Sequence, residues 1–194
     1  MPAELAFFYT PDRQVWRQWL ADHHDSAPGV WFVFYKKKTG TPSLTYDEAV
    51  EEALCYGWVD SLPKKVDEER HALKFSPRKP KSVWSKPNKD RVERLVANGL
   101  MTPTGLTKIE RAKQDGSWDA LNDSDALLMP ADLDRALAAD GVAAANFNRF
   151  SPGSRKIILS WIGAAKRPET RASRIAETVR LAALGKRANF PADR

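Results

Sequence analysis

The chain has 194 residues, of which 42% are hydrophobic and 29% charged, and its formal net charge is +6. This balance excludes a disordered chain and allows one domain, or a domain with a helical extension. A single cysteine excludes an internal disulfide framework. The chain starts without the features of a signal peptide and holds no long apolar run, so we expect a cytoplasmic protein without a membrane span.

The first part of the chain alternates between helical and extended patterns. PDRQVWRQWLADH has helical spacing, and PGVWFVFYKKK predicts a strand over residues 30–37. LTYDEAVEEALCYG predicts a second helix, because Thr45 and Glu48 are spaced as a capping box. GWVDSLPKKVDEERHALKF predicts a hairpin over residues 58–76, with Pro63 at an edge or a bulge. The fold class is therefore α+β, with a small sheet of about three strands flanked by helices.

The second part of the chain is predicted to be helical. Two short helices, near residues 87–98 and 103–116, precede the acidic linker DALNDSDALLMP. Every later segment has helical spacing, including a final pair joined at Pro168. We expect an α+β domain over residues 1–120 and an all-helical region over residues 121–194 packed on it.

A basic loop provides the main candidate site. KFSPRKPKSVWSKPN, residues 74–88, carries five cationic side chains and three prolines. The prolines stiffen the loop, and the helix that follows presents free N–H groups that suit an anion. We expect an anion to be attracted by the loop cations and seated at the helix start, with a tryptophan stacked on it; the residues are Arg78, Lys79, Lys81, Ser85, Asn88, and Trp84 or Trp58. The alternative is a connecting loop with solvated lysines and Trp84 in the core.

A row of arginines is the second candidate. Arg167, Arg171 and Arg174 lie at helical spacing and suit phosphate or carboxylate. We favour the alternative that this row pairs with the acidic segment 115–140 or faces solvent.

The segment ALCYGWVDS is the third candidate. Asp60 shares a strand face with Trp58, and its carboxylate either lies in a pocket or pairs with Lys64 or Lys65. Cys55 is expected to be a buried structural thiol, because the C-terminal end of a helix opposes a thiolate. The histidines have no ligand set around them, so we expect no metal, no cofactor and no catalytic residue.

Several motifs together resemble the YdeI/OmpD-associated family, also called bacteriocin-protection proteins. These are LTYDEAVEEALCYGWVDS, KFSPRKPKSVWSKPN, GLMTPTGLTKIERAKQDGSW and the tail FSPGSRKIILSWIGAAKRPETRASRI, so that the resemblance covers roughly residues 10–185. It implies a role in bacterial resistance to bacteriocins and cationic antimicrobial peptides. It implies no reaction and transfers no catalytic residue. Some members are periplasmic, whereas this sequence begins without an export signal.

Together these observations predict a non-enzymatic resistance factor that binds an anionic small molecule or a phosphate-bearing ligand. One alternative is a nucleic-acid-binding module that uses both basic segments and exposed tryptophans. The other is an enzyme with a pocket around Asp60. The sequence leaves the oligomeric state open.

Overall fold

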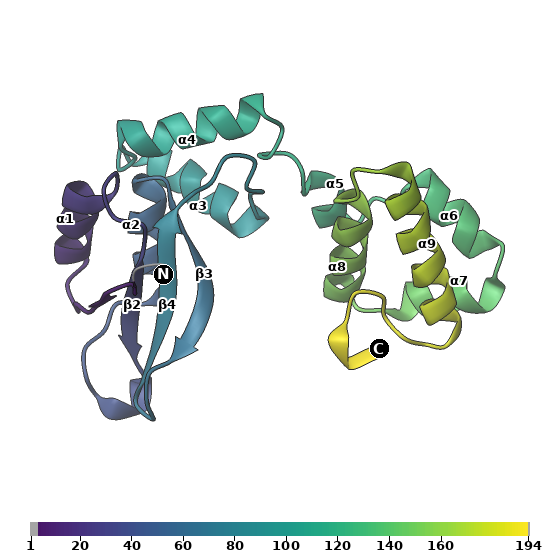
Figure 1. Ribbon diagram of the computed structural model, residues 1–194, viewed down its shortest axis with the longest axis horizontal. Helices are drawn as coiled ribbons and strands as arrows, with labels where there is room; N and C mark the ends of the chain where they lie inside the picture. The colour runs from purple at the N-terminus through teal and green to yellow at the C-terminus, as the bar shows by residue number, and fades with distance from the viewer. Residues whose placement is uncertain (1–3, 194) are drawn as a thin grey trace. The chain divides into compact units, whose positions relative to one another are not determined.

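The computed structural model describes residues 4–193 and divides the chain into two compact units, Met1–Asp119 and Ala120–Arg194. Figure 1 shows both units, the first with a sheet and the second with helices alone. The first unit contains, in order, β1 (Phe7–Phe8), α1 (Arg13–His23), β2 (Val30–Tyr35), the 3-10 turn η1 (Lys37–Thr39), α2 (Tyr46–Cys55), β3 (Trp58–Lys65), β4 (Arg70–Pro77), α3 (Lys86–Ala97) and α4 (Pro103–Gln114).

The sheet has the strand order β1-β2-β4-β3. β1 is parallel to β2, and the other neighbours are antiparallel. The α+β class is confirmed, but the sheet in the described residues has four strands and not about three. The additional strand is β1, which the sequence analysis missed because two residues are too few to show an alternating pattern. β3 is an edge strand with a register shift between Asp60 and Pro63, as expected for a proline that has no N–H to donate to a neighbour.

One face of the sheet is covered by helices. Trp16 of α1 is fully buried against Phe32 and Phe75, which project from β2 and β4. Its indole N–H donates to the carbonyl of Ala49 in α2, at 3.0 Å. These contacts fix α1 and α2 against the strands and form the core of the first unit.

The ends of α2 follow from its sequence. The Thr45 hydroxyl accepts a hydrogen bond from the Glu48 amide, and the Glu48 carboxylate accepts one from the Thr45 amide, so the predicted capping box is confirmed. Tyr56 caps the other end, and Gly57 follows with a φ of 70°, a conformation that glycine adopts without strain. This turn leads directly into β3.

The second unit contains α5 (Asn122–Asp125), α6 (Ala131–Ala138), α7 (Gly141–Arg149), α8 (Pro152–Gly163), α9 (Pro168–Ala183) and the 3-10 turn η2 (Pro191–Asp193). Its core is separate from that of the first unit and is built around Leu133, Phe147, Ile158 and Ile162, all with no exposed surface. The predicted acidic linker includes α5, a single helical turn. Asp140 and Ser151 cap α7 and α8 through their side chains.

Candidate functional site

The basic loop between β4 and α3 is fixed by hydrogen bonds to the residues that follow α4. The Lys81 amide donates to one oxygen of Asp115 at 3.1 Å, and the Ser117 amide donates to the other at 2.9 Å. The Trp84 amide donates to the Ser117 carbonyl at 3.3 Å. Lys81 has a φ of 60°, a left-handed conformation uncommon for a residue other than glycine. The loop therefore has a defined shape and does not simply trail through solvent.

Arg78 is the most unusual side chain in this loop. It is only 5% exposed, and its guanidinium lies 3.7 Å from the centre of the Trp84 ring. One terminal nitrogen donates to the Ser82 hydroxyl and the Val83 carbonyl, each at 3.0 Å. Burial lowers the pKa of Arg78 to about 10, so the group is still cationic at neutral pH. A buried cation thus rests on an aromatic ring and neutral acceptors.

Two buried N–H groups beside each other lack a partner. Nε of Arg78 and Nε1 of Trp84 are both inaccessible to solvent and make no hydrogen bond within the described residues. Leaving a buried donor unsatisfied costs about 1–3 kcal/mol, so each such group requires an explanation. Two of them within one stacked pair make this position a candidate site for a group that accepts hydrogen bonds.

Arg78 and Trp84 line a small hollow together with residues of α4. The free space at its centre is about 10 Å³, comparable to the room that one water-sized group needs. Its walls carry five cations and one carboxylate; the lining residues are Arg78, Lys79, Pro80, Lys81, Ser82, Trp84, Lys108, Arg111, Ala112, Asp115 and Ser117. Hydrogen bonds from Ser117, followed by one from Lys81, lower the pKa of Asp115, so its carboxylate is ionised. The hollow remains strongly cationic.

The structure brings Arg78, Lys79, Lys81 and Trp84 to this hollow but not the predicted helix start. Ser85 precedes α3 without making a side-chain cap, and the amides of Asn88 and Lys89 donate to its carbonyl at 3.0 Å. The Asn88 side chain accepts from Arg91 at 2.9 Å. Neither Ser85 nor Asn88 lines the hollow. Its remaining wall comes instead from α4, through Lys108 and Arg111, which sequence reasoning missed.

Trp58 and Asp60 also lie outside the hollow. Trp58 is 1% exposed, and its indole N–H donates to the His24 carbonyl at 3.0 Å, so its ring is part of the core. Asp60 is half-buried and accepts a hydrogen bond from the Tyr46 hydroxyl at 3.0 Å. Burial, followed by the charge of Asp60, raises the pKa of Tyr46 to about 12. Asp60 does not line the hollow.

The predicted row of Arg167, Arg171 and Arg174 lies in the second unit, and two of these arginines bind other groups of the protein. Arg171 binds both oxygens of Asp132, at 2.6 and 2.8 Å, and this contact lowers the pKa of Asp132 to about 2. Asp132 belongs to the acidic segment that the sequence analysis named as the alternative partner. Arg174 donates to the Trp161 carbonyl, and Arg167 is exposed. The three guanidiniums therefore do not form a common array.

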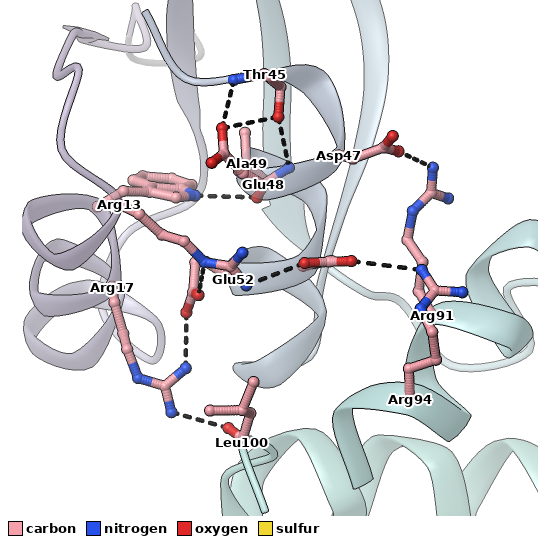
Figure 2. A network of polar contacts seen from close by, with 12 residues as sticks. Arg13, Arg17, Thr45, Asp47, Glu48, Ala49, Glu52, Arg91, Arg94 and Leu100 are labelled. Atoms are coloured by element: carbon pink, nitrogen blue, oxygen red, sulfur yellow. Dashed lines mark hydrogen bonds and ion pairs between the residues drawn. The ribbon is translucent and has the colours of Figure 1, made fainter. Parts of the chain in front are cut away.

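A second polar cluster, which the sequence analysis did not anticipate, joins three helices (Figure 2). Glu52 of α2 is buried and accepts from Arg13 at 2.5 Å and from Arg17 at 2.6 Å, both on α1. Glu51 is bridged by Arg13 and by Arg94 of α3. Burial by itself lowers the pKa of Arg13 and Arg17, but hydrogen bonds to Glu52 outweigh it and both values are raised. The adjoining groove has a volume of about 490 Å³. The arginines that line it form ion pairs with the glutamates that line it.

The described residues contain no group of histidine, cysteine and carboxylate side chains that would hold a metal ion. None of the helices in residues 4–193 is long and apolar enough to cross a membrane. The thiol of Cys55 is buried, and burial raises its pKa to about 11. The structure thus defines an α+β protein in which a basic hollow in the sheet-containing unit is the main candidate site.

Comparison with known families gives each unit its own match. The chain belongs to the family described as a domain of unknown function, DUF8412, whose model matches residues 8–108. Residues 126–185, within the second unit, match the family described as Bacteriocin-protection, YdeI or OmpD-Associated. The resemblance drawn from the sequence is confirmed over this C-terminal segment, which is shorter than residues 10–185. A search of curated proteins and a search of solved structures found no match.

Proposed function

We propose that this chain is a bacteriocin-protection-type protein whose first unit binds an anionic ligand in the hollow between the basic loop and α4. The observation that carries the proposal is the stacked pair of Arg78 and Trp84, each with a buried N–H group that lacks a partner. Natural proteins leave few such groups, and an anion entering the hollow would give both N–H groups an acceptor. The match of residues 126–185 supports the wider class of function.

The charge of the hollow favours a ligand with more than one negative charge. Five cationic side chains line it, and Asp115 is the sole carboxylate among its lining residues. A single carboxylate group would leave most of these cations unpaired, whereas a phosphate monoester carries about two charges at neutral pH and a pyrophosphate carries more. Arginine and backbone N–H groups also match the geometry of phosphoryl oxygens.

The size of the hollow indicates how such a ligand binds. A free space of about 10 Å³ admits one oxygen atom, not a whole metabolite. The ligand therefore places one oxygen in the hollow beside the stacked pair of Arg78 and Trp84, while the more exposed Lys79, Lys81 and Arg111 contact its remaining charge. Because Arg78 already covers one face of the Trp84 ring, that ring stacks on Arg78 and does not stack on the ligand, which replaces the stacking role predicted for Trp84.

Charge reversal of Arg111 tests this proposal. Arg111 is exposed on α4, so Arg111→Glu leaves the core intact and places a negative charge in the hollow. We expect the affinity for inorganic pyrophosphate, measured by isothermal titration calorimetry at low ionic strength, to fall at least about tenfold, because a repulsion replaces an attraction.

Lys113→Glu is the matched control for this experiment. Lys113 is exposed on the same helix, but its ammonium lies 5.4 Å from the Trp118 ring and does not line the hollow. We expect this variant to bind pyrophosphate within about threefold of the wild type, the difference arising from net charge alone. Equal losses in the two variants, or an absence of pyrophosphate binding to the wild type, would reject the hollow as an anion site.

A further inference from the structure

The second face of the sheet, opposite to the helices, carries exposed aromatic rings. Side chains alternate along a strand, so Phe8 contacts Trp16 of the core while its neighbour Phe7 projects to the other side. Phe7 is aligned with Trp31 in the strand register, and the two rings stack at 6.4 Å. We call this side of the sheet the open face; its aromatic residues are Phe7, Tyr9, Trp31 and Tyr35.

These rings are accessible from solvent. Phe7 is 47% exposed and Tyr9 38% exposed, while Trp31 and Tyr35 are half-buried. An exposed Phe on a short edge strand has no role in the core, which lies on the other face. Contiguous exposed aromatic surface of this kind commonly marks an interaction site.

Cationic side chains lie over the same rings. The Lys64 ammonium, from β3, is 4.9 Å from the centre of Phe7 and 5.2 Å from that of Trp31. It reaches them across Ala72 of β4, whose small side chain is fully buried beneath. Lys74 is the register partner of Trp31, and Arg70 lies 5.8 Å from the Tyr35 ring. The strand positions that form the open face carry no carboxylate, although Asp67, in the turn before β4, forms an ion pair with Arg70.

A flat array of rings with interspersed cations suits a ligand that has flat rings and a repeated negative charge. Bases of a single strand stack on aromatic side chains, and the backbone phosphates meet lysine and arginine. The bases of a duplex are stacked inside it, so they are not available to stack on these aromatic rings. An acidic peptide supplies the charge but lacks the stacking surfaces.

We propose that the open face binds single-stranded nucleic acid, in which bases stack on Phe7 and Trp31 in place of the Lys64 ammonium, and Lys64 and Lys74 pair with the phosphates. This site is separate from the anion-binding hollow, since none of its residues lines that hollow. It also differs from the nucleic-acid-binding module considered from the sequence, which would use both basic segments, because Lys74 alone among its residues belongs to one of them.

The test measures binding of a fluorescently labelled oligothymidine of about twelve nucleotides to the full-length chain by anisotropy, a length within the usual site size. An oligouridine of equal length distinguishes RNA from DNA, and preferential binding of either strand supports the proposal. A duplex of equal length and poly-L-glutamate serve as competitors. We expect both competitors to displace the strand at least about tenfold less effectively than unlabelled strand does.

Two variants locate the site, and a neighbouring lysine provides the control. Phe7→Leu keeps an apolar side chain but removes the ring, and is expected to weaken binding at least about fivefold through lost stacking. Lys64→Glu is expected to weaken binding about tenfold and to reduce the salt dependence by about one phosphate contact. Lys65 is also exposed on β3 but faces the other side, beside His71, so Lys65→Glu should change the affinity less than about threefold.

The outcome separates this proposal from the anion-binding hollow. Arg111→Glu should leave the affinity for the strand within about threefold, because Arg111 lies in the hollow. The proposal is overturned if poly-L-glutamate competes as well as the strand, or if Phe7→Leu and Lys64→Glu are folded by circular dichroism and bind normally. If Arg111→Glu no longer binds the oligonucleotide while Lys64→Glu still binds it, the binding site is the hollow, and the proposal is equally overturned.

Discussion

In the described part of the first unit three charged side chains are buried, Glu52, Arg78 and Lys89, and the first two have contrasting environments. Glu52 is surrounded by the guanidiniums of Arg13 and Arg17, so its charge is neutralised within the fold. Arg78 has no carboxylate in hydrogen-bond contact and leaves one N–H group unpaired. Since burying an uncompensated charge is costly, the first arrangement stabilises the fold, whereas the second leaves a buried cation that the proposed anion would neutralise.

The contribution of Glu52 to stability is measurable. Glu52→Gln keeps the shape of the side chain but removes the charge that Arg13 and Arg17 share, and both arginines retain some access to water. We expect the free energy of unfolding, measured in urea, to fall by about 2–3 kcal/mol. Glu51→Gln, at a more exposed neighbour, should cost about 1 kcal/mol or less. Equal losses of unfolding free energy in the two variants would show that the buried ion pairs of Glu52 contribute no more to stability than the more exposed ones of Glu51.

At the level of individual residues, the sequence predicted part of the candidate site. The prolines and cations of residues 77–81 indicated a stiff basic loop, and Arg78, Lys79 and Lys81 do line one hollow. It did not predict that Arg78 is buried, because an arginine between prolines in a polar stretch is typical of an exposed loop. It also assigned Trp58 to the ligand, although its indole N–H is held by His24 in the core.

Helix α4 is the element that completes the hollow, and its position depends on contact with the end of α2. Both the amide and the hydroxyl of Thr102 donate to the Cys55 carbonyl, at 3.3 and 2.5 Å. A Cβ atom placed on Gly105 would lie 2.3 Å from that same carbonyl oxygen, so the close approach requires glycine. One and two turns further along, Lys108 and Arg111 line the hollow.

Gly105→Ala tests the importance of this approach. Alanine favours a helix over glycine by about 1 kcal/mol, but here the backbone of Cys55 must shift to make room. We expect the free energy of unfolding to fall by about 1–3 kcal/mol, and pyrophosphate to bind more weakly because Lys108 and Arg111 move with the helix. Gly153→Ala in α8, which meets nothing within 4 Å, is the control and should leave stability unchanged or raise it by up to about 1 kcal/mol. A stabilised Gly105→Ala variant would contradict the proposed packing.

Element positions along the chain were predicted better than contacts between elements. The helices near residues 87–98 and 103–116 were expected, since Thr102, Pro103 and the surrounding apolar spacing are local signals. The docking of α4 beside the basic loop is a contact between distant residues, and no local pattern encodes it. For the same reason Lys108 and Arg111 were missed, as was the two-residue strand β1.

For the whole molecule, the two compact units correspond to two family matches. Residues 8–108 lie in the first unit and residues 126–185 in the second. The bacteriocin-protection match therefore concerns the helical unit, whereas both proposed binding sites lie in the unit with the sheet. The sequence resemblance was assigned to nearly the whole chain, because motifs from both units were considered together. The functional question becomes how the ligand binding proposed for the first unit relates to the family match of the second.

The most direct test of the central claim follows the indole N–H signals of the full-length, ¹⁵N-labelled chain while pyrophosphate is added. If an anion enters the hollow, the Trp84 signal, assigned with a Trp84→Phe variant, will shift as its unpaired N–H group gains an acceptor, and the shift will saturate. The Trp58 signal should stay unchanged, because its N–H group is already bonded to His24. A Trp84 signal that remains in place while pyrophosphate binds, or an absence of binding, would contradict the account.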